Sequence, residues 1–272
     1  MKNEIGFMQG RLVKSEKRGA IQYFPSRNWK KELKLANENK IKLIEWTVNI
    51  QNIKSNPLYT GKTYEINHEL KKNKIVTKSV TCDFFMEKPF FKKKYLKDKN
   101  KFLKILKKII LNGSKIGIKY FVLPLVDKSS ISNKFEELIL IKEIEKICKN
   151  LKKDKFIIFE IDYKPDQISN FINKFKSKKI GINYDTGNSS ALGYKIEDEI
   201  KYFKYVKNIH IKDRFLNGHT VRLGQGNWKY KQFFKKIKNT YKGNFILQTA
   251  PSFRNPLQEL LLNKKFLNKL LN

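Results

Sequence analysis

The sequence contains few of the residues that would mark a secreted, disulfide-stabilised or membrane-spanning protein. Its 272 residues include only two cysteines, Cys82 and Cys148, which cannot build a disulfide framework or a paired zinc site. No segment approaches the ~20 apolar residues of a membrane span. The charged start, MKNEIGFMQG, lacks the apolar core of a secretory signal. These absences predict a cytoplasmic protein that does not span a membrane.

Histidine and arginine are also scarce. There are three histidines, and only six of the 59 basic residues are arginine, so lysine dominates a formal net charge of +34. A charge of this size suits binding to nucleic acid or to an anionic membrane surface. However, the lysines are spread along the whole chain together with abundant asparagine and isoleucine, as an AT-rich genome would produce. We therefore favour solvated helix faces over a polyanion site, although a basic surface can still steer small anionic substrates.

Low-complexity segments, flexible linkers and shifts of composition that would mark a domain boundary are absent as well. Instead, short apolar segments alternate with longer amphipathic ones. The strand-like segments are Ile5–Met8, Lys42–Trp46, Ile75–Thr81, Tyr120–Leu123, Phe156–Ile161, Ile180–Asp185, Val206–Lys212 and Asn244–Gln248. The helical segments, with apolar residues at three- and four-residue spacing, include Asn100–Ile116, Ser132–Leu151, Lys164–Lys176, Tyr230–Tyr241 and Pro256–Leu271.

Eight strands, each followed by a helix or a long loop, predict an α/β fold: a (β/α)8 TIM barrel that occupies residues 1–272 as a single domain. An open doubly wound sheet would show the same alternation. The segment after the first strand, FMQGRLV, holds a single glycine and lacks the dinucleotide-binding fingerprint. The count of eight strands favours the barrel.

Polar residues stand at the ends of the last four predicted strands, where barrels place their active sites. In each of these strands the apolar neighbours would pack outward under the helices and leave the polar side chain pointing inward. The inward residues are Glu160 in FIIFEID, Asp185 in IGINYDTGN, His210 in VKNIHIKD and Gln248 in NFILQTA. Taken alone, each could be an interior polar group that its neighbours satisfy. Together they predict one shared divalent ion, Mn²⁺, Mg²⁺, Co²⁺ or Zn²⁺, which would offset the cost of burying the charges.

These motifs resemble the sugar phosphate isomerase/epimerase group of the xylose isomerase-like TIM barrel superfamily. The likeness rests on FEID, NYDTGNSSALGY, NIHIKDR and VRLGQGNW, and it extends from GFMQGRL to LQTA. It implies one divalent metal ion, held by the ends of strands five to eight, with a small hydroxy-carbonyl or sugar-like ligand above it. Many ketose epimerases of this superfamily use two metal-bound glutamates as proton donor and acceptor, whereas here the fourth position is Gln248. Since an amide cannot exchange a proton near neutral pH, the two-base mechanism does not carry over unchanged.

Other polar residues at the same end of the barrel are candidates for catalysis or substrate binding. Lys212 lies one step beyond His210 on the inward face, where it could act as an acid or form a rim salt bridge with Asp213. Glu45 in LIEWTVN could bind a substrate hydroxyl or take part in a buried ion pair. Arginines in the loops suggest recognition of phosphate or carboxylate groups. The remaining candidates for substrate binding are Arg11, Asn188, Arg214, His219, Arg222 and Arg254.

The favoured function is a metal-dependent isomerase or epimerase of a sugar or sugar phosphate, in which Glu160 moves the proton of an enediolate. The alternative is a metal-dependent dehydratase or lyase of a related hydroxy-carbonyl compound. A basic nucleic-acid-binding protein is the third hypothesis, with FFKKKYLKDKNKF as its best segment. Three histidines are too few for the multi-metal centre of the apurinic endonucleases in this superfamily. We expect a small sugar substrate as partner, rather than membrane or nucleic acid, on a fold compatible with a homo-oligomer.

Overall fold

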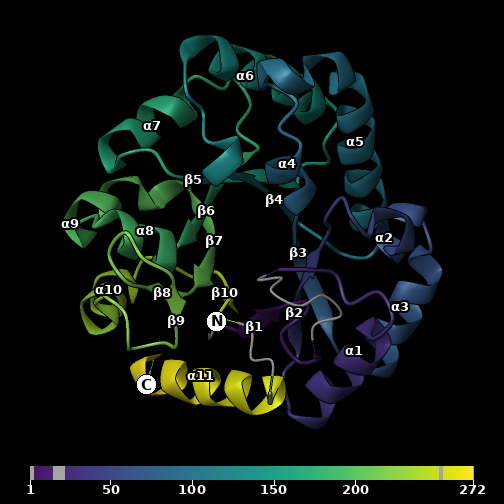
Figure 1. Cartoon of the computed structure of the whole chain (residues 1–272), viewed down its shortest axis with the longest axis vertical. Helices are drawn as coiled ribbons and strands as arrows, with labels where there is room; N and C mark the ends of the chain where they lie inside the picture. Colours follow the sequence, from purple (N-terminus) through teal and green to yellow (C-terminus); the bar gives the residue numbers. More distant parts are fainter. Residues whose placement is uncertain (1–2, 15–21, 251–253, 272) are drawn as a thin grey trace.

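Short apolar segments form the strands of a closed parallel barrel (Figure 1). The computed structural model describes residues 3–14, 22–250 and 254–271. The barrel strands are β1 (Ile5–Met8), β2 (Leu43–Thr47), β3 (Val76–Thr81), β4 (Tyr120–Leu125), β5 (Phe156–Ile161), β6 (Ile180–Asp185), β7 (Val206–Ile211) and β10 (Phe245–Leu247). They follow one another around the barrel in the order β1-β10-β7-β6-β5-β4-β3-β2. The first and last strands therefore pair with each other, which confirms the predicted barrel and excludes the open sheet.

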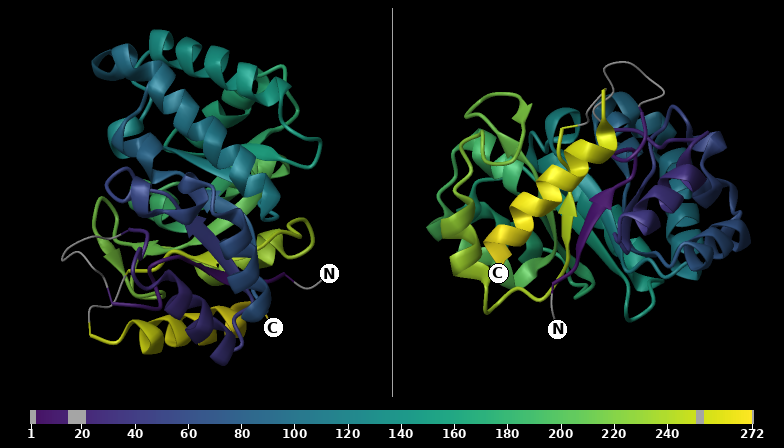
Figure 2. Two further views of the ribbon diagram at one scale, coloured as in Figure 1. Left: turned by 90° about the vertical axis from the view of Figure 1, so that its right-hand side faces the viewer. Right: turned by 90° about the horizontal axis from the view of Figure 1, so that it is seen from below.

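Helices cover the outside of the barrel (Figures 1 and 2). The α-helices are α1 (Trp29–Glu38), α2 (Pro57–Thr60), α3 (Thr63–Lys72), α4 (Asp83–Glu87), α5 (Lys99–Lys115), α6 (Lys134–Lys149), α7 (Pro165–Asn173), α8 (Thr186–Leu192), α9 (Ile196–Glu199), α10 (Tyr230–Ile237) and α11 (Pro256–Leu271). The 3₁₀ helices are η1 (Ile53–Ser55), η2 (Lys93–Asp98), η3 (Asp127–Ser129) and η4 (Ile200–Tyr205). None of the described helices is long and apolar enough to cross a membrane.

Two segments differ most from the sequence-based expectation, and the helix expected over Lys164–Lys176 also ends early, at Asn173. The helix expected over Tyr230–Tyr241 ends at Ile237, since the chain then turns and the Tyr241 hydroxyl donates to the carbonyl of Asn244 at 2.6 Å. After β7 the chain forms a small antiparallel hairpin of β8 (Asp213–Arg214) and β9 (Thr220–Val221), which the apolar pattern does not predict. A hairpin this short leaves no periodic signal.

The two faces of the strands have different roles. Outward residues pack under the helices: Tyr184 stacks on Phe233 with ring centroids 5.3 Å apart, and Phe159 meets Phe171 edge-on at 5.6 Å. Inside the barrel, a separate apolar cluster consists of Met8, Leu43 and Ile246. Polar inward side chains occupy the strand ends beyond this cluster. The predicted inward and outward phases of β5, β6, β7 and β10 are confirmed.

A buried carboxylate holds the turn that follows β1. Gly10 adopts a positive φ of 88°, and a Cβ there would lie 2.7 Å from the carbonyl oxygen of Tyr23. Glu32 on α1 accepts the backbone N–H groups of Gly10 at 2.8 Å and Leu12 at 3.0 Å. Burial raises the pKa of Glu32 to about 7, although these N–H donors and the charge of Arg11 act in the opposite direction. Glu32 thus fixes the segment that carries Arg11.

The raised pKa of Glu32 makes the stability of the fold depend on pH. The folded state holds this proton more tightly than the unfolded state, whose reference pKa is 4.5. The resulting stabilisation is full below pH 4.5 and is lost as the pH rises through about 7. The free energy of unfolding of the wild type, minus that of Glu32→Gln, should therefore fall by about 3 kcal/mol between pH 4.5 and 8. Denaturant titrations at both pH values measure this difference.

Glu65 provides a control of opposite sign. It is partly exposed, and its hydrogen bond to Lys30 lowers its pKa. Glu65→Gln should therefore show a small change in the other direction, because stability from a lowered carboxyl pKa is lost as the pH falls. Equal differences at both pH values for Glu32→Gln would contradict the role assigned to Glu32.

Candidate active site

The ends of β5, β6 and β7 bring three potential ligand groups together. Glu160, Asp185 and His210 are all buried, and one ligand atom of each lies within 4.8 Å of the others. The strand register causes this convergence, because Asp185 pairs directly with His210. Three of the four residues predicted to bind a metal ion thus form one cluster.

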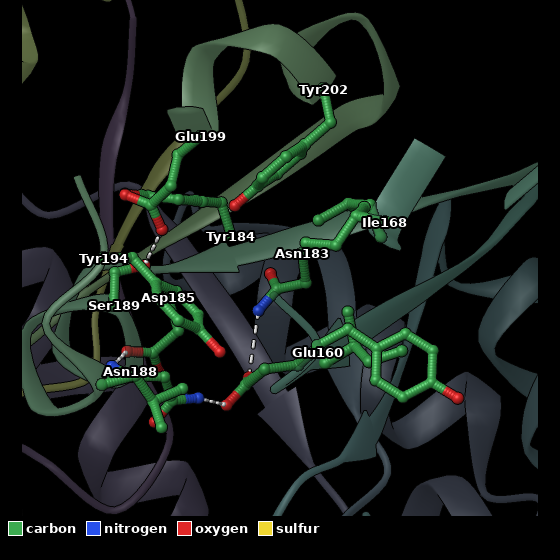
Figure 3. Close-up of a pocket in the computed structure, with 14 residues that line it drawn as sticks. Glu160, Ile168, Asn183, Tyr184, Asp185, Asn188, Ser189, Tyr194, Glu199 and Tyr202 are labelled. Atoms are coloured by element: carbon green, nitrogen blue, oxygen red, sulfur yellow. Dashed lines mark hydrogen bonds between the residues drawn. The ribbon is translucent and has the colours of Figure 1, made fainter. Parts of the chain in front are cut away.

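Both carboxylate oxygens of Glu160 are held by amide groups (Figure 3). Oε1 accepts from the side-chain amide of Asn188 at 2.8 Å, and Oε2 accepts from that of Asn183 at 3.1 Å. The Nδ1 atom of His210 also lies 3.1 Å from Oε2. Burial alone would raise the pKa of Glu160, but His210, the charge of Lys212 and the Asn188 hydrogen bond lower it overall. Glu160 is therefore an ionised carboxylate fixed in one orientation.

Asp185 ends β6 and caps the following helix. Its Oδ1 accepts the backbone N–H groups of Gly187 at 2.7 Å and Asn188 at 2.9 Å, at the start of α8. The other oxygen, Oδ2, lies 3.0 Å from the ammonium of Lys212 but accepts no hydrogen bond from the described residues. A buried carboxylate oxygen that points into the cluster with spare acceptor capacity is what a metal ligand requires. The two carboxylates and the imidazole fit a divalent ion in both donor chemistry and spacing.

His210 lies between two carboxylates. Nε2 contacts Oε1 of Glu45 at 2.7 Å, and Nδ1 faces Glu160. Burial by itself would lower the pKa of His210, but the charges and hydrogen bonds of the two glutamates raise it to about 10. The two carboxylates thus favour the cationic form of the imidazole in the protein without a metal ion.

Glu45 lies deeper in the barrel than the substrate-binding role predicted for it would require. The side chain is fully buried, and four donors surround its carboxylate. These donors are Ser79 Oγ at 2.5 Å, Thr81 Oγ1 at 2.6 Å, Asn208 Nδ2 at 2.9 Å and His210 Nε2 at 2.7 Å. The geometry corresponds to the alternative reading, a buried ion pair, in which Glu45 orients His210.

Gln248, the fourth predicted ligand, is linked to the cluster through a lysine. The ammonium of Lys212 donates to Oε1 of Gln248 at 3.2 Å and also pairs with Asp185. Asp213 does not take part, because its carboxylate accepts backbone N–H groups of Gly224 and Gly226. Instead of the rim salt bridge considered for Lys212, the structure has an inward ammonium between two of the predicted ligands.

The other predicted binding residues fall into two groups. Asn188 contacts Glu160 directly, and Arg214 approaches Asn188 at 3.5 Å while donating to the carbonyl of Gly218. Arg11 is buried at the barrel mouth and donates through Nε to the carbonyl of Thr249 at 2.9 Å. The others are exposed: His219 packs on Phe215, Arg222 pairs with Glu259 on α11, and Arg254 precedes α11. The structure thus does not bring these last three into the cluster.

Several residues that support the site are not among the site residues predicted from the sequence. Asn183 and Asn208 bond to each other at 2.8 Å and connect Glu160 to Glu45. Their inward phase is visible in the sequence, but their partners are not. Behind the site, Glu199 accepts from Tyr184 at 2.7 Å and joins α9 to β6 (Figure 3). Burial raises the pKa of Glu199 to about 7.

Comparisons with known proteins agree with this geometry. A family model described as xylose isomerase-like TIM barrel matches residues 33–269. No curated protein matches the sequence significantly.

Solved structures show the same fold. A xylose isomerase domain protein from Planctomyces limnophilus aligns with a TM-score of 0.75 and 16% identity, over 99% of this chain and 96% of that one. A D-psicose 3-epimerase, solved in the presence of D-fructose, aligns with a TM-score of 0.74 and 11% identity, over 98% and 99%. The IOLI protein, solved with a bound zinc atom, aligns with a TM-score of 0.74 and 16% identity, over 98% of each chain. At these identities the likeness concerns the fold.

The histidine between two glutamates predicts an NMR result. In protein kept with a chelator, the ring nitrogens of His210 should report a doubly protonated imidazole at pH 8, because its pKa is raised to about 10. Glu45→Gln keeps an acceptor oxygen but removes a charge, so the pKa of His210 should fall by about one to three pH units. Long-range ¹H–¹⁵N spectra measure this directly, since only three histidines contribute. Glu38→Gln, on the exposed side of α1, is the control. A neutral ring at pH 8 in the wild type would contradict the assignment.

Proposed function

Because the chain belongs to the xylose isomerase-like TIM barrel family, we propose that it is a divalent-metal-dependent isomerase or epimerase of a sugar or sugar phosphate. The observation that carries this proposal is the convergence of Glu160, Asp185 and His210 at the ends of successive strands. The barrel mouth is also where such folds place catalysis. The epimerase among the similar structures supports the reaction class.

Glu160, Asp185 and His210 would hold the ion, with Gln248 as the additional oxygen ligand. A bound divalent ion would supply Lewis-acid polarisation of a substrate carbonyl and its neighbouring hydroxyl. Oδ2 of Asp185 supports this assignment, because it is buried and accepts no hydrogen bond from the described residues, although it forms an ion pair with Lys212 at 3.0 Å.

Glu160 is the proposed proton carrier. It is ionised, and the amides of Asn183 and Asn188 fix both of its oxygens. A fixed carboxylate at the barrel mouth can remove the proton beside a carbonyl and return it to the neighbouring carbon of the enediolate, which completes an isomerisation. An epimerisation would need a second proton donor on the opposite face of the same carbon. Gln248 can bind and orient but cannot exchange a proton.

The ammonium of Lys212 gives the alternative reaction its support. It lies between Asp185 and Gln248 at 3.0 Å and 3.2 Å, where a cationic acid could protonate a departing hydroxyl. The same enediolate would then lose water rather than regain its proton. A dehydratase or lyase is therefore the second candidate.

Metal affinity tests the ligand assignment. Asp185→Asn should weaken Mn²⁺ binding by at least about tenfold, because it removes a negative ligand. Lys212→Met should tighten Mn²⁺ binding by on the order of tenfold, because it removes a positive charge 3.0 Å from Asp185. Lys212→Arg keeps the charge and is the matched control. Titration followed by the EPR signal of free Mn²⁺ gives the affinities, and unchanged affinity in Asp185→Asn would refute the site.

Proton exchange tests the role of Glu160. Solvent deuterium uptake into a panel of ketoses and their phosphates identifies a substrate. On that substrate, Glu160→Gln should lower turnover by ~10²–10⁴-fold while the metal content is largely retained. Gln248→Glu should bind the ion more tightly, because it adds a negative charge. Glu38→Gln controls for the loss of a surface carboxylate. Near-normal turnover in Glu160→Gln would move the search for the base to Lys212.

A further inference from the structure

Polar groups without partners are buried on the opposite side of the barrel mouth, at the ends of β1, β2 and β3. Both terminal nitrogens of Arg11, Nη1 and Nη2, lack a hydrogen-bond partner among the described residues, and so does Oδ2 of Asp83. Arg11 is 2% exposed and Asp83 is 5% exposed. Nε2 of Gln9 and Oγ1 of Thr47 are likewise buried and lack a hydrogen-bond partner among the described residues. Since buried polar groups are normally satisfied, this concentration of free donors and acceptors indicates a missing ligand.

The backbone directs Arg11 and Asp83 to the mouth of the barrel. Arg11 follows β1, and its Nε donates to the carbonyl of Thr249, just beyond β10. Asp83 begins α4, two positions after Thr81, whose hydroxyl points inward to Glu45 at 2.6 Å. β3 ends at Thr81, so the position of Asp83 rests on its contact with Gln22 at 2.5 Å rather than on strand alternation.

A glutamine connects Asp83 to the candidate active site. The side-chain amide of Gln22 donates to Oδ1 of Asp83 at 2.5 Å, and its oxygen accepts from Gln248 at 2.8 Å. Gln248 in turn accepts from Lys212. Asp83 also lies in the electrostatic field of both Glu160 and Arg11. These contacts connect Asp83 to the candidate site, and the bond from Arg11 to Thr249, the neighbour of Gln248, brings Arg11 to the same end of the barrel.

Arg11 and Asp83 carry complementary groups that do not neutralise each other directly. No ion pair joins them within the part of the chain that the structure describes. Burial lowers the pKa of Arg11 to about 10, and burial raises the pKa of Asp83 to about 8. Both groups are thus held in an unfavourable environment, which a ligand that donates to one and accepts from the other would relieve.

We propose that Arg11 and Asp83 form a second half-site, which binds hydroxyl groups at the end of the substrate remote from Glu160. A hydroxyl group can accept from the guanidinium and can pair with Oδ2 of Asp83 in either protonation state, as a donor to the carboxylate or as an acceptor from the carboxyl, whereas a phosphate mainly accepts. A phosphate would also enter the repulsive field of Glu87 and Glu160, the two carboxylates that help to raise the pKa of Asp83. The half-site therefore selects an uncharged, hydroxylated sugar over its phosphate ester. This inference rests on the proposed function and narrows its substrate class.

The test measures sugar binding and turnover in matched variants. The probes are D-fructose, D-psicose and D-fructose 6-phosphate, titrated calorimetrically into the Mn²⁺-loaded protein. Asp83→Asn is the main variant, and it is measured at a pH above the pKa of about 8, where Asp83 is ionised. Gln22 holds Oδ1, so the new amide nitrogen then replaces the accepting Oδ2 with a donor. Arg11→Lys keeps the charge but removes the planar pair of nitrogens. Asp198→Asn, on exposed α9, is the matched control, and unfolding midpoints verify that each variant folds.

We expect the free sugars to bind the wild type at least as well as the phosphate ester. Asp83→Asn should weaken binding of the free sugars by about tenfold or more, through KM rather than kcat, and Asp198→Asn should not. The half-site is refuted if affinity is unchanged in folded Asp83→Asn, if neither free sugar binds, or if the phosphate ester binds tenfold more tightly in an Arg11-dependent way.

Deuterium uptake separates this inference from the proposed function. If Asp83→Asn exchanges deuterium with an unaltered KM, the proposed isomerase activity is supported and the half-site is refuted. If sugar binding depends on Asp83 but the wild type exchanges deuterium into none of the probes, the half-site is supported and the proposed isomerase activity is refuted.

Discussion

The imidazole of His210, bound between Glu45 and Glu160, is the contact on which the rest of the site depends. Each carboxylate would be costly to bury alone, and the single positive charge of the ring is shared between them at 2.7 and 3.1 Å. A buried ion pair is stable only when its remaining acceptors are also satisfied. The hydroxyls and amides that surround Glu45 meet that requirement. The polar interior of the barrel is therefore the support of the site rather than an incidental feature of the strands.

The same constraint determines the turn after β6. One oxygen of Asp185 accepts the backbone N–H groups at the start of α8, and the other oxygen faces the cluster. Gly187 follows, and a Cβ there would lie 2.7 Å from both Cγ and Cε of Lys212. Only a glycine lets the lysine stem lie this close to the turn, and that position puts the ammonium beside Asp185. The motif DTGN and the motif HIKD are thus parts of one packed unit.

The sequence predicts which side chains face inward, but not which of them touch. Alternation along β5, β6, β7 and β10 was sufficient to place Glu160, Asp185 and His210 at one end of a barrel, because each strand reports its own phase. The contact between His210 and Glu45 crosses the barrel and joins residues 165 positions apart. Strand periodicity carries no information on such a pair, so the sequence is equally compatible with substrate binding by Glu45 and with a buried ion pair. Gln22 lies outside every helix and strand, and its link to Gln248 over 226 positions leaves no local signal at all.

The hydrogen bonds around Gln248 explain why an amide, rather than a carboxylate, follows β10. The donors run in one direction: Lys212 donates to Gln248, Gln248 donates to Gln22, and Gln22 donates to Asp83. Only a side chain that accepts at one end and donates at the other can stand second in this series. A carboxylate there could accept from Lys212, but it would face the side-chain oxygen of Gln22. The amide of Gln22 would then have to flip, so that its nitrogen donates to the new carboxylate and its oxygen faces Asp83. Asp83 would then have to donate to that oxygen, so this arrangement would hold only below the pKa of about 8 that burial gives Asp83. The glutamine therefore belongs with Gln22 and Asp83, and the two walls of the barrel mouth are chemically coupled through it.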